Sequence, residues 1–252
     1  MKKKNNELKN WDNKTWLSSS AYINSFNTFL LKKKKLNKSS QILDIGCGRG
    51  KIFGVLSRKL NLVNKPIGID PVAHKDVDGG IDFRNEDVFK FFKTSQIKFD
   101  LIMIKQTLHF FNKNKISKLI KICKNNLNKD GMLIIFSLNT LNNEIPCFKL
   151  MKKKLNRGLE RDSRMIKSVC KILKVNKIDK FKFKVSITKN KYIQMLKHRY
   201  ISCLVNLDKN QISKGIKEIE DIHPNKMMFD DILICVKYKR KQHYKIKSSE
   251  EF

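Results

Sequence analysis

Three glycines at alternate positions follow a short apolar run near the start of the chain. The run Gln41–Ile45 has strand character and contains one acid, Asp44, and the glycines that follow are Gly46, Gly48 and Gly50. An apolar helical pattern begins directly after them. Glycine lacks a Cβ, so the backbone there can come close to a ligand. Doubly wound folds hold nucleotide-like cofactors at such a turn between a strand and a helix, and the run predicts a site of this kind.

Two acids further along the chain are placed to complete such a site. Asp70 closes the second predicted strand, twenty positions after the last of the glycines, where doubly wound folds bind ribose hydroxyls. The alternative is an ordinary strand-end turn acid, which Pro71 would favour. Asp87, within Asn85–Val88, follows the third predicted strand at the edge where ligands collect. A dinucleotide fingerprint needs a glycine where Lys51 stands, which disfavours an NAD-dependent oxidoreductase.

The order of these residues resembles that of class I S-adenosylmethionine-dependent methyltransferases. The first motif of that family is an acid followed by three alternating glycines, as at Asp44–Gly50. Phe99–Phe110 resembles the family's fourth motif, and Leu127–Ile134 resembles its turn into the fifth strand. The resemblance covers about residues 41–137 well and the rest weakly. It implies an α/β fold: a doubly wound, Rossmann-like sheet, mostly parallel with an antiparallel last strand, and helices on both faces.

The resemblance also implies a cofactor, S-adenosylmethionine, and assigns residues to it. The glycines would approach its methionine part and adenosine, and Asp44 would steer its ammonium group. Asp70 would bind the ribose, while Asp87 and the Val88 amide would meet the adenine ring. The backbone after the fourth strand, from Lys105, would also touch the cofactor. The implied set is Asp44, Gly46, Cys47, Gly48, Gly50, Asp70, Asp87, Val88 and Lys105, with no metal.

Departures from the family pattern bear on the methyl acceptor. Many small-molecule members carry paired histidines where this chain has His109-Phe110. No Asn-Pro-Pro-Tyr type sequence occupies residues 105–108, and no Pro-Cys pair ends the fourth strand. These differences disfavour methylation of exocyclic amines in nucleic acid and a covalent cysteine mechanism on pyrimidines. They favour a small acceptor and leave RNA ribose methylation open.

Four side chains are candidates for contact with the acceptor. His109 is the candidate general base, because an imidazole titrates near neutral pH, and the alternative is a packing histidine in the pocket wall. Gln106 follows the fourth strand, where the resemblance turns side chains toward the substrate. Arg199 and Tyr200 lie between the last two predicted strands, and Arg199 could pair with a carboxylate or phosphate. A surface arginine of a basic protein is the commoner case.

Residues 1–40 are predicted to form an N-terminal helical extension, because the apolar residues of Tyr22–Leu30 fall on one helical face. Trp11, Trp16 and Tyr22 suggest two roles for this extension. It could close over the cofactor, or its aromatic rings could pack in the core, which is the commoner fate of such side chains.

The rest of the chain alternates strand and helix patterns, which predicts a parallel sheet covered on both faces. An alternating segment and a short apolar run follow near the end. The predicted strands are Gln41–Ile45, Ile67–Ile69, Ile81–Arg84, Phe99–Ile104, Met132–Phe136, Phe181–Ile187 and Ile232–Val236. The predicted helices are Lys51–Leu60, Val88–Phe92, Ile116–Leu127, Phe148–Leu173 and one after a variant capping box at Asp208–Gln211.

Composition bounds the class of protein. A chain of 252 residues with 40% hydrophobic residues can bury the core of one α/β domain. Its formal charge is +32, but only eight of its 55 basic residues are arginine, and lysine is spread from end to end. Dedicated phosphate recognition tends to use the guanidinium fork as well, so this charge favours a solvated surface over a nucleic-acid surface. Six cysteines without CxxC spacing, and no apolar segment of membrane length, predict reduced thiols and a cytoplasmic protein.

The sequence therefore predicts a methyltransferase domain over residues 41–238, with a cofactor half at 41–137 and a substrate-covering half at 138–238. Residues 239–252 are predicted to be a polar tail. The expected function is methyl transfer from S-adenosylmethionine to a small molecule. One alternative is an RNA methyltransferase that uses the basic surface, and another is a cofactor-binding partner subunit without catalysis. The oligomeric state is not predicted.

Overall fold

A computed structural model describes residues 15–240. Residues 1–14, with Trp11, and residues 241–252, most of the predicted tail, lie outside the described part. A seven-stranded sheet forms the centre, with the order β3-β2-β1-β4-β5-β7-β6. The strands are β1 (Ile42–Ile45), β2 (Ile67–Ile69), β3 (Asp82–Arg84), β4 (Phe99–Lys105), β5 (Leu127–Leu138), β6 (Ile178–Thr188) and β7 (Lys226–Lys239).

The first five strands run parallel, and β7 runs antiparallel to both β5 and β6. This sheet confirms the predicted doubly wound, mostly parallel fold. Because β7 lies inside the sheet, β6 takes the edge. Burial alternates along β6, so one of its faces is exposed to solvent, whereas all four residues of β1 are buried. Helices cover both faces of the parallel part, which is why its strands are apolar throughout.

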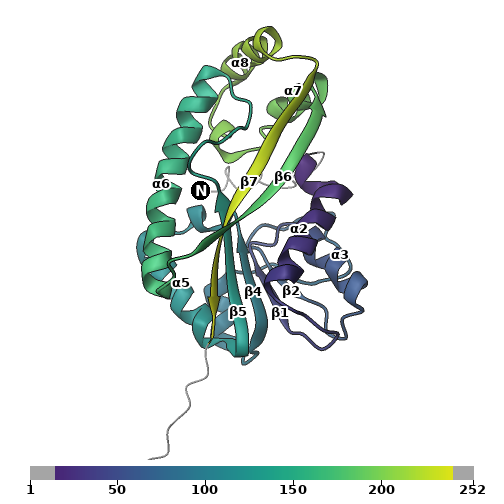
Figure 1. The fold of residues 1–252 in the computed structure, drawn as a ribbon, viewed down its shortest axis with the longest axis vertical. Coiled ribbons are helices and arrows are strands. Elements are labelled where there is room, and N and C mark those ends of the chain that lie inside the picture. Colours follow the sequence, from purple (N-terminus) through teal and green to yellow (C-terminus); the bar gives the residue numbers. More distant parts are fainter. Residues whose placement is uncertain (1–14, 241–252) are drawn as a thin grey trace, which may run out of the picture.

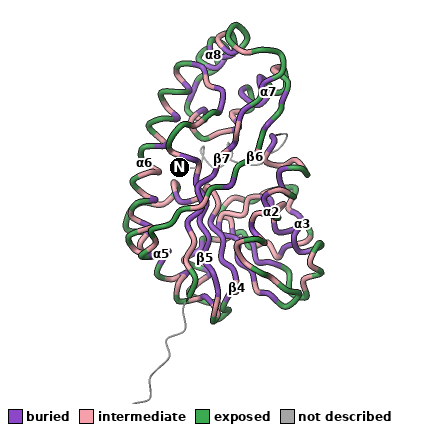
Figure 2. Tube along the Cα trace, viewed as in Figure 1, coloured by how far each residue is buried: buried purple, intermediate pink, exposed green. Residues whose placement is uncertain are grey.

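Two helices, α2 (Ser20–Lys33) and α3 (Lys51–Leu60), cover one face, and α4 (Val88–Thr94) and α5 (Lys113–Asn125) cover the other (Figure 1). The long α6 (Lys149–Leu173) follows α5 along the second face. Each face has its own apolar core, and buried residues concentrate in the central strands (Figure 2). The remaining elements are α7 (Lys189–Lys197), α8 (Lys209–Ile222) and the short 3-10 helices η1 (Trp16–Ser18), η2 (Leu108–Phe110) and η3 (Ser202–Leu204).

A two-stranded arm rises beyond the carboxyl edge of the sheet. β7 pairs with β5 only between Leu233 and Lys239, whereas its pairing with β6 continues to Lys226, opposite Thr188. This ribbon leads to α7 and α8 at the top of the view (Figure 1). Sequence patterns predicted only the middle of β7 and no helix at α7. The predicted capping box at Asp208 and Gln211 is confirmed at the start of α8.

The first two residues of the predicted polar tail, Lys239 and Arg240, lie in the described part of the chain. Lys239 is the last residue of β7 and pairs with Met132 of β5. The next residue, Arg240, donates a backbone hydrogen bond of 2.9 Å to the Gly131 carbonyl. Pairing with β5 therefore extends to Lys239, in a lysine-rich stretch that local composition predicts to be solvated.

The N-terminal helix α2 belongs to the core. Tyr22, Phe26 and Leu30 are fully buried, and the Phe26 ring lies 4.7 Å from that of Phe136 and 5.1 Å from that of Phe181. Ser19 caps the helix by accepting from the Tyr22 N–H. Of the two roles suggested for the extension, the structure favours packing for the aromatic residues that it describes.

Candidate cofactor and acceptor site

The glycine loop connects β1 to α3 with three residues in the left-handed region, Gly46, Gly48 and Gly50, with φ of 75°, 55° and 67°. A Cβ on Gly46 would lie 2.2 Å from Thr107 Oγ1, and one on Gly50 would lie 2.1 Å from Ile81 Cδ1. A Cβ on Gly48 would meet nothing within 4 Å. The outer two glycines are thus required by packing as well as by φ. Only Gly48 faces open space that a ligand could occupy.

Asp70, at the end of β2, ties the glycine loop to the next loop. Its Oδ2 accepts from the Gly48 N–H at 3.0 Å, and its Oδ1 accepts from the Val72 N–H at 2.9 Å. The Asn85 side-chain amide donates to the Asp70 carbonyl at 3.0 Å. Each carboxylate oxygen has two lone pairs, so Asp70 retains capacity to accept from a ligand hydroxyl.

Asp87 and Val88 begin α4 beside these loops. The exposed Asp87 caps the helix, because its Oδ1 accepts from the Phe89 N–H at 2.8 Å. Its other oxygen receives no hydrogen bond from the residues that the structure describes. The Val88 side chain is buried in the core, so only its backbone is available to a ligand.

Asp44 is buried at the end of β1, between its two neighbouring strands, and 4% of its surface is exposed. Burial raises the pKa of this carboxyl to about 7. The nearby Lys105 ammonium opposes that increase, and the negative charge of Asp70 adds to it. A carboxyl with this pKa is partly protonated at neutral pH. A cation that binds beside it would favour the ionised carboxylate.

Lys105 ends β4 and turns toward α2. Its Nζ donates to Gln106 Oε1 at 3.0 Å and lies 5.5 Å and 5.6 Å from the ring centres of Tyr22 and Phe26. Gln106 has a φ of 52°, outside the range that most residues adopt. Strained backbone of this kind clusters at functional sites.

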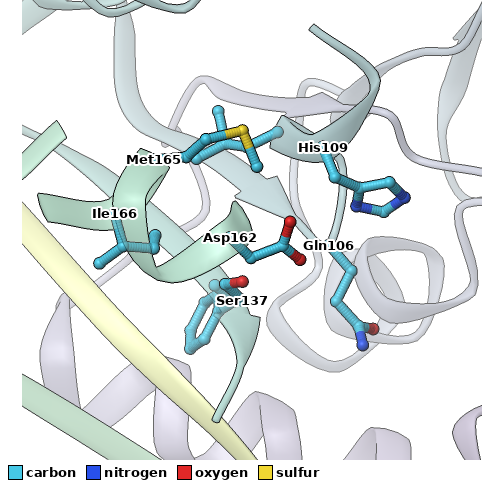
Figure 3. Close-up of a pocket in the computed structure, with 8 residues that line it drawn as sticks. Gln106, His109, Ser137, Asp162, Met165 and Ile166 are labelled. Carbon is cyan, nitrogen blue, oxygen red and sulfur yellow. The ribbon is translucent and has the colours of Figure 1, made fainter. Parts of the chain in front are cut away.

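A small pocket of about 10 Å³, with room for roughly one water molecule, lies beside Gln106 and His109 (Figure 3). His109 Nε2 is buried and has no hydrogen-bond partner. Burial lowers the pKa of the imidazole, so the neutral, proton-accepting form persists to lower pH than usual. Besides Gln106 and His109, the lining residues are Leu108, Phe136, Ser137, Asp162, Met165 and Ile166.

Sequence reasoning missed the part of this pocket that α6 contributes. Asp162 lies 53 positions after His109, and only the return of α6 along the sheet brings the two together. The one signal for α6 was its apolar periodicity, which predicts a packed face and not a polar pocket residue.

The other two acceptor candidates have structural contacts. The Arg199 guanidinium donates to the Leu207 carbonyl through Nε at 3.3 Å and Nη2 at 3.0 Å. Tyr200 is buried, with its hydroxyl 2.9 Å from that of Tyr192 and its ring against Trp16. Neither residue lines the pocket beside His109. Their role in substrate binding stays a prediction.

The remaining candidates meet at one edge of the sheet. Asp44, Asp70 and Asp87 stand at or just after the carboxyl ends of neighbouring parallel strands. Lys105, Gln106 and His109 follow β4, on the other side of β1. Strand order reverses between β1 and β4, and open α/β sheets bind ligands at such a switch point. Among the described residues no three His, Cys, Asp or Glu side chains are grouped to hold a metal, and no helix could span a membrane.

This sheet order, with the glycine loop at its switch point, defines a class I methyltransferase fold. A family model described as "Methyltransferase domain" matches residues 19–162, more than half of the chain. The chain belongs to that family. A comparison with curated proteins finds no match.

Solved structures of methyltransferases have the same fold. One, described as a methyltransferase from an antibiotic biosynthesis pathway of Anabaena variabilis, is 13% identical, with a TM-score of 0.59 over 84% of this chain and 96% of that one. The plantazolicin methyltransferase BpumL, in complex with a desmethylPZN analog and SAH, is 15% identical, with a TM-score of 0.51 over 96% and 90%. A protein of Bacillus halodurans is 11% identical, with a TM-score of 0.51 over 86% and 100%.

Proposed function

We propose that the chain is an S-adenosylmethionine-dependent methyltransferase that acts on a small-molecule acceptor. The glycine loop carries the proposal, because Gly48 opens onto empty space while its N–H is held by Asp70 at the switch point. Family membership supports it. So does the SAH bound to BpumL, since SAH is what S-adenosylmethionine becomes once its methyl group has left.

The described residues fit the parts of this cofactor. The open face of Gly48 suits its close approach, and the buried carboxyl of Asp44 suits an ammonium group. Asp70 and the free oxygen of Asp87 suit the ribose hydroxyls and an adenine amino group. The bound cofactor would supply an activated methyl group on a sulfonium. The chain then has to orient the acceptor, and orientation can contribute about 7–11 kcal/mol of barrier lowering in favourable cases.

Departures from the nucleic-acid methyltransferase patterns at residues 105–108 favour a small acceptor. The pocket beside His109 has room for about one water molecule, so side chains there would have to move before an acceptor could enter. An RNA methyltransferase is the alternative, since the formal net charge of +32 would attract a phosphate backbone. The unpaired cysteine pattern supports a cytoplasmic setting. We propose residues 41–137 as the cofactor half of the domain and residues 138–238 as its substrate-covering half.

A labelled-methyl experiment tests the choice of acceptor. The full chain is incubated with S-adenosylmethionine carrying a labelled methyl group and either a small-molecule extract or an RNA pool. We expect label in small molecules and none in RNA. Label in RNA alone would replace the proposal with the RNA alternative. Cofactor binding without label in either pool would favour the partner subunit.

The pKa of Asp44 predicts how cofactor binding depends on pH. The free carboxyl has a pKa of about 7, and an adjacent ammonium would lower that pKa by favouring the carboxylate. Binding would therefore release a proton, and affinity should fall as pH decreases below about 7, by up to roughly tenfold per pH unit. Calorimetric titrations between pH 5 and pH 7 measure this slope. The Asp44→Asn variant should show weak binding without the slope, and an equal slope in both proteins would contradict the assignment.

A further inference from the structure

A histidine lies beside the acid that follows β2. His74 belongs to the loop after this strand, four positions beyond Asp70, and its Nε2 is 3.8 Å from Asp70 Oδ1. The side chains of His74 and Asp70 are 3% and 14% exposed, respectively. The His74 ring lies at 78° to the ring of Phe83 in β3, with the ring centres 6.4 Å apart. The loop between β2 and β3 therefore holds an imidazole against the proposed ribose-binding acid.

The distance between these two groups leaves room for a third atom to join them. A nitrogen and an oxygen 3.8 Å apart do not hydrogen bond to each other. By contrast, the direct pair of Arg58 and Asp78 has a distance of 2.6 Å. One ligand oxygen about 2.8 Å from both His74 and Asp70 would span their separation and bond to each. The pair is thus spaced for a bridging oxygen.

The other contacts of Asp70 place this pair at the edge of the space proposed for the cofactor. Its Oδ2 accepts from the N–H of Gly48, the glycine whose face is open, and its Oδ1 accepts from the Val72 N–H. These bonds fix the carboxylate, so it cannot turn toward His74 without breaking one of them. Each oxygen has two lone pairs, and Oδ1 can therefore accept a second hydrogen bond.

A hydroxyl group has the chemistry that such a pair would bind. It carries one proton to donate and two lone pairs to accept with. Asp70 Oδ1 takes the role of acceptor. His74 Nε2 donates in two forms, the imidazolium and the neutral tautomer that carries its proton on Nε2. A carboxylate on one side and an imidazole N–H on the other thus match both functions of one hydroxyl.

We propose that His74 is a second ribose-binding residue, and that one ribose hydroxyl of S-adenosylmethionine donates to Asp70 Oδ1 and accepts from His74 Nε2. This inference rests on the proposed function and adds one residue to its cofactor contacts. The sequence resemblance assigns the ribose to Asp70 alone, because His74 lies outside the motifs that carry it. Only the distance between the two side chains indicates the second contact.

This arrangement requires a free hydroxyl on the ribose. A deoxyribose offers neither the donor nor the acceptor at the position that has lost its oxygen. A phosphate ester there would have no proton for Asp70 and would bring negative charge toward its carboxylate. The affinity for cofactor analogues that are altered at the ribose should therefore depend on His74.

The test is a set of calorimetric titrations of the full chain with S-adenosylmethionine and with its 2′-deoxy and 3′-deoxy analogues. In His74→Ala we expect the affinity for S-adenosylmethionine to fall about fivefold, the scale of one net hydrogen bond. One of the two analogues should bind His74→Ala and the unchanged protein equally well, because the bridging hydroxyl is already missing from it. His74→Gln keeps an N–H donor and should recover part of the affinity for S-adenosylmethionine.

Lys75→Gln is the matched control, because Lys75 is exposed in the same loop, and it should leave all these affinities unchanged. If the alanine variant does not fold, His74→Leu, which keeps an apolar contact with Phe83, gives the same comparison. A loss by the same factor for S-adenosylmethionine and both analogues would mean that His74 only supports the loop, and it would overturn the proposal. So would an unchanged affinity for S-adenosylmethionine. Failure of the unchanged protein to bind S-adenosylmethionine would instead overturn the proposed function.

Discussion

Replacing Gly48 with asparagine should weaken binding of S-adenosylmethionine at least about 100-fold, or about 2.7 kcal/mol, while the chain stays folded. The backbone at Gly48 has a φ of 55°, which asparagine tolerates better than most residues. A side chain there meets no protein atom within 4 Å, so it would extend into the space assigned to the cofactor. Calorimetry gives the affinity, and thermal unfolding checks the fold.

Gly79→Asn is the matched control for this experiment. Gly79 also has open space around it, but it lies outside the loop and has no left-handed φ. We expect the control to bind the cofactor with unchanged affinity. Gly48→Asn with full affinity would show that the open face of the loop is not the cofactor site. Gly46→Asn is not informative here, because its side chain would collide with Thr107 and destabilise the fold.

Truncating Phe26 to alanine should lower the free energy of unfolding by about 3–5 kcal/mol. The ring is fully buried and contacts the rings of Tyr22, Phe136 and Phe181, which join α2 to β5 and β6. Removing it leaves a cavity that the helix cannot close without moving. Denaturant unfolding, followed by circular dichroism, measures the loss.

Thr28→Ala is the control, since Thr28 is exposed on the same helix and should change stability by no more than about 0.5 kcal/mol. If α2 were instead a lid over the cofactor, Phe26→Ala would weaken cofactor binding and leave stability nearly unchanged. That result would contradict the core assignment. Deleting residues 1–30 should accordingly give insoluble protein.

The cofactor half of the fold was predictable because its signals are local. Gly46, Gly48 and Gly50 stand between a buried strand and an amphipathic helix, so three consecutive features indicate one loop. The bounds of α3 match the prediction, Lys51–Leu60. Parallel strands covered on both faces are apolar throughout, which makes them visible in sequence.

The rest depends on contacts that local sequence does not encode. β7 extends from Lys226 because β6 pairs with it beyond the sheet, and Asp230 and Asp231 interrupt its apolar pattern before Ile232. Asp162 becomes a pocket residue only through the path of α6. Tyrosine is a residue type that often contacts ligands, yet Tyr200 is buried by packing against Trp16 and Tyr192. Sequence reasoning proposed Tyr200 as a site residue but could not place its side chain, and it did not indicate Asp162.

Calorimetric titration of the full chain with S-adenosylmethionine, and separately with NAD, tests the central claim most directly. The glycine loop, the open face of Gly48 and Lys51 in place of the third dinucleotide glycine predict saturable one-to-one binding of S-adenosylmethionine and no binding of NAD. Saturable binding of NAD with none of S-adenosylmethionine would contradict the account.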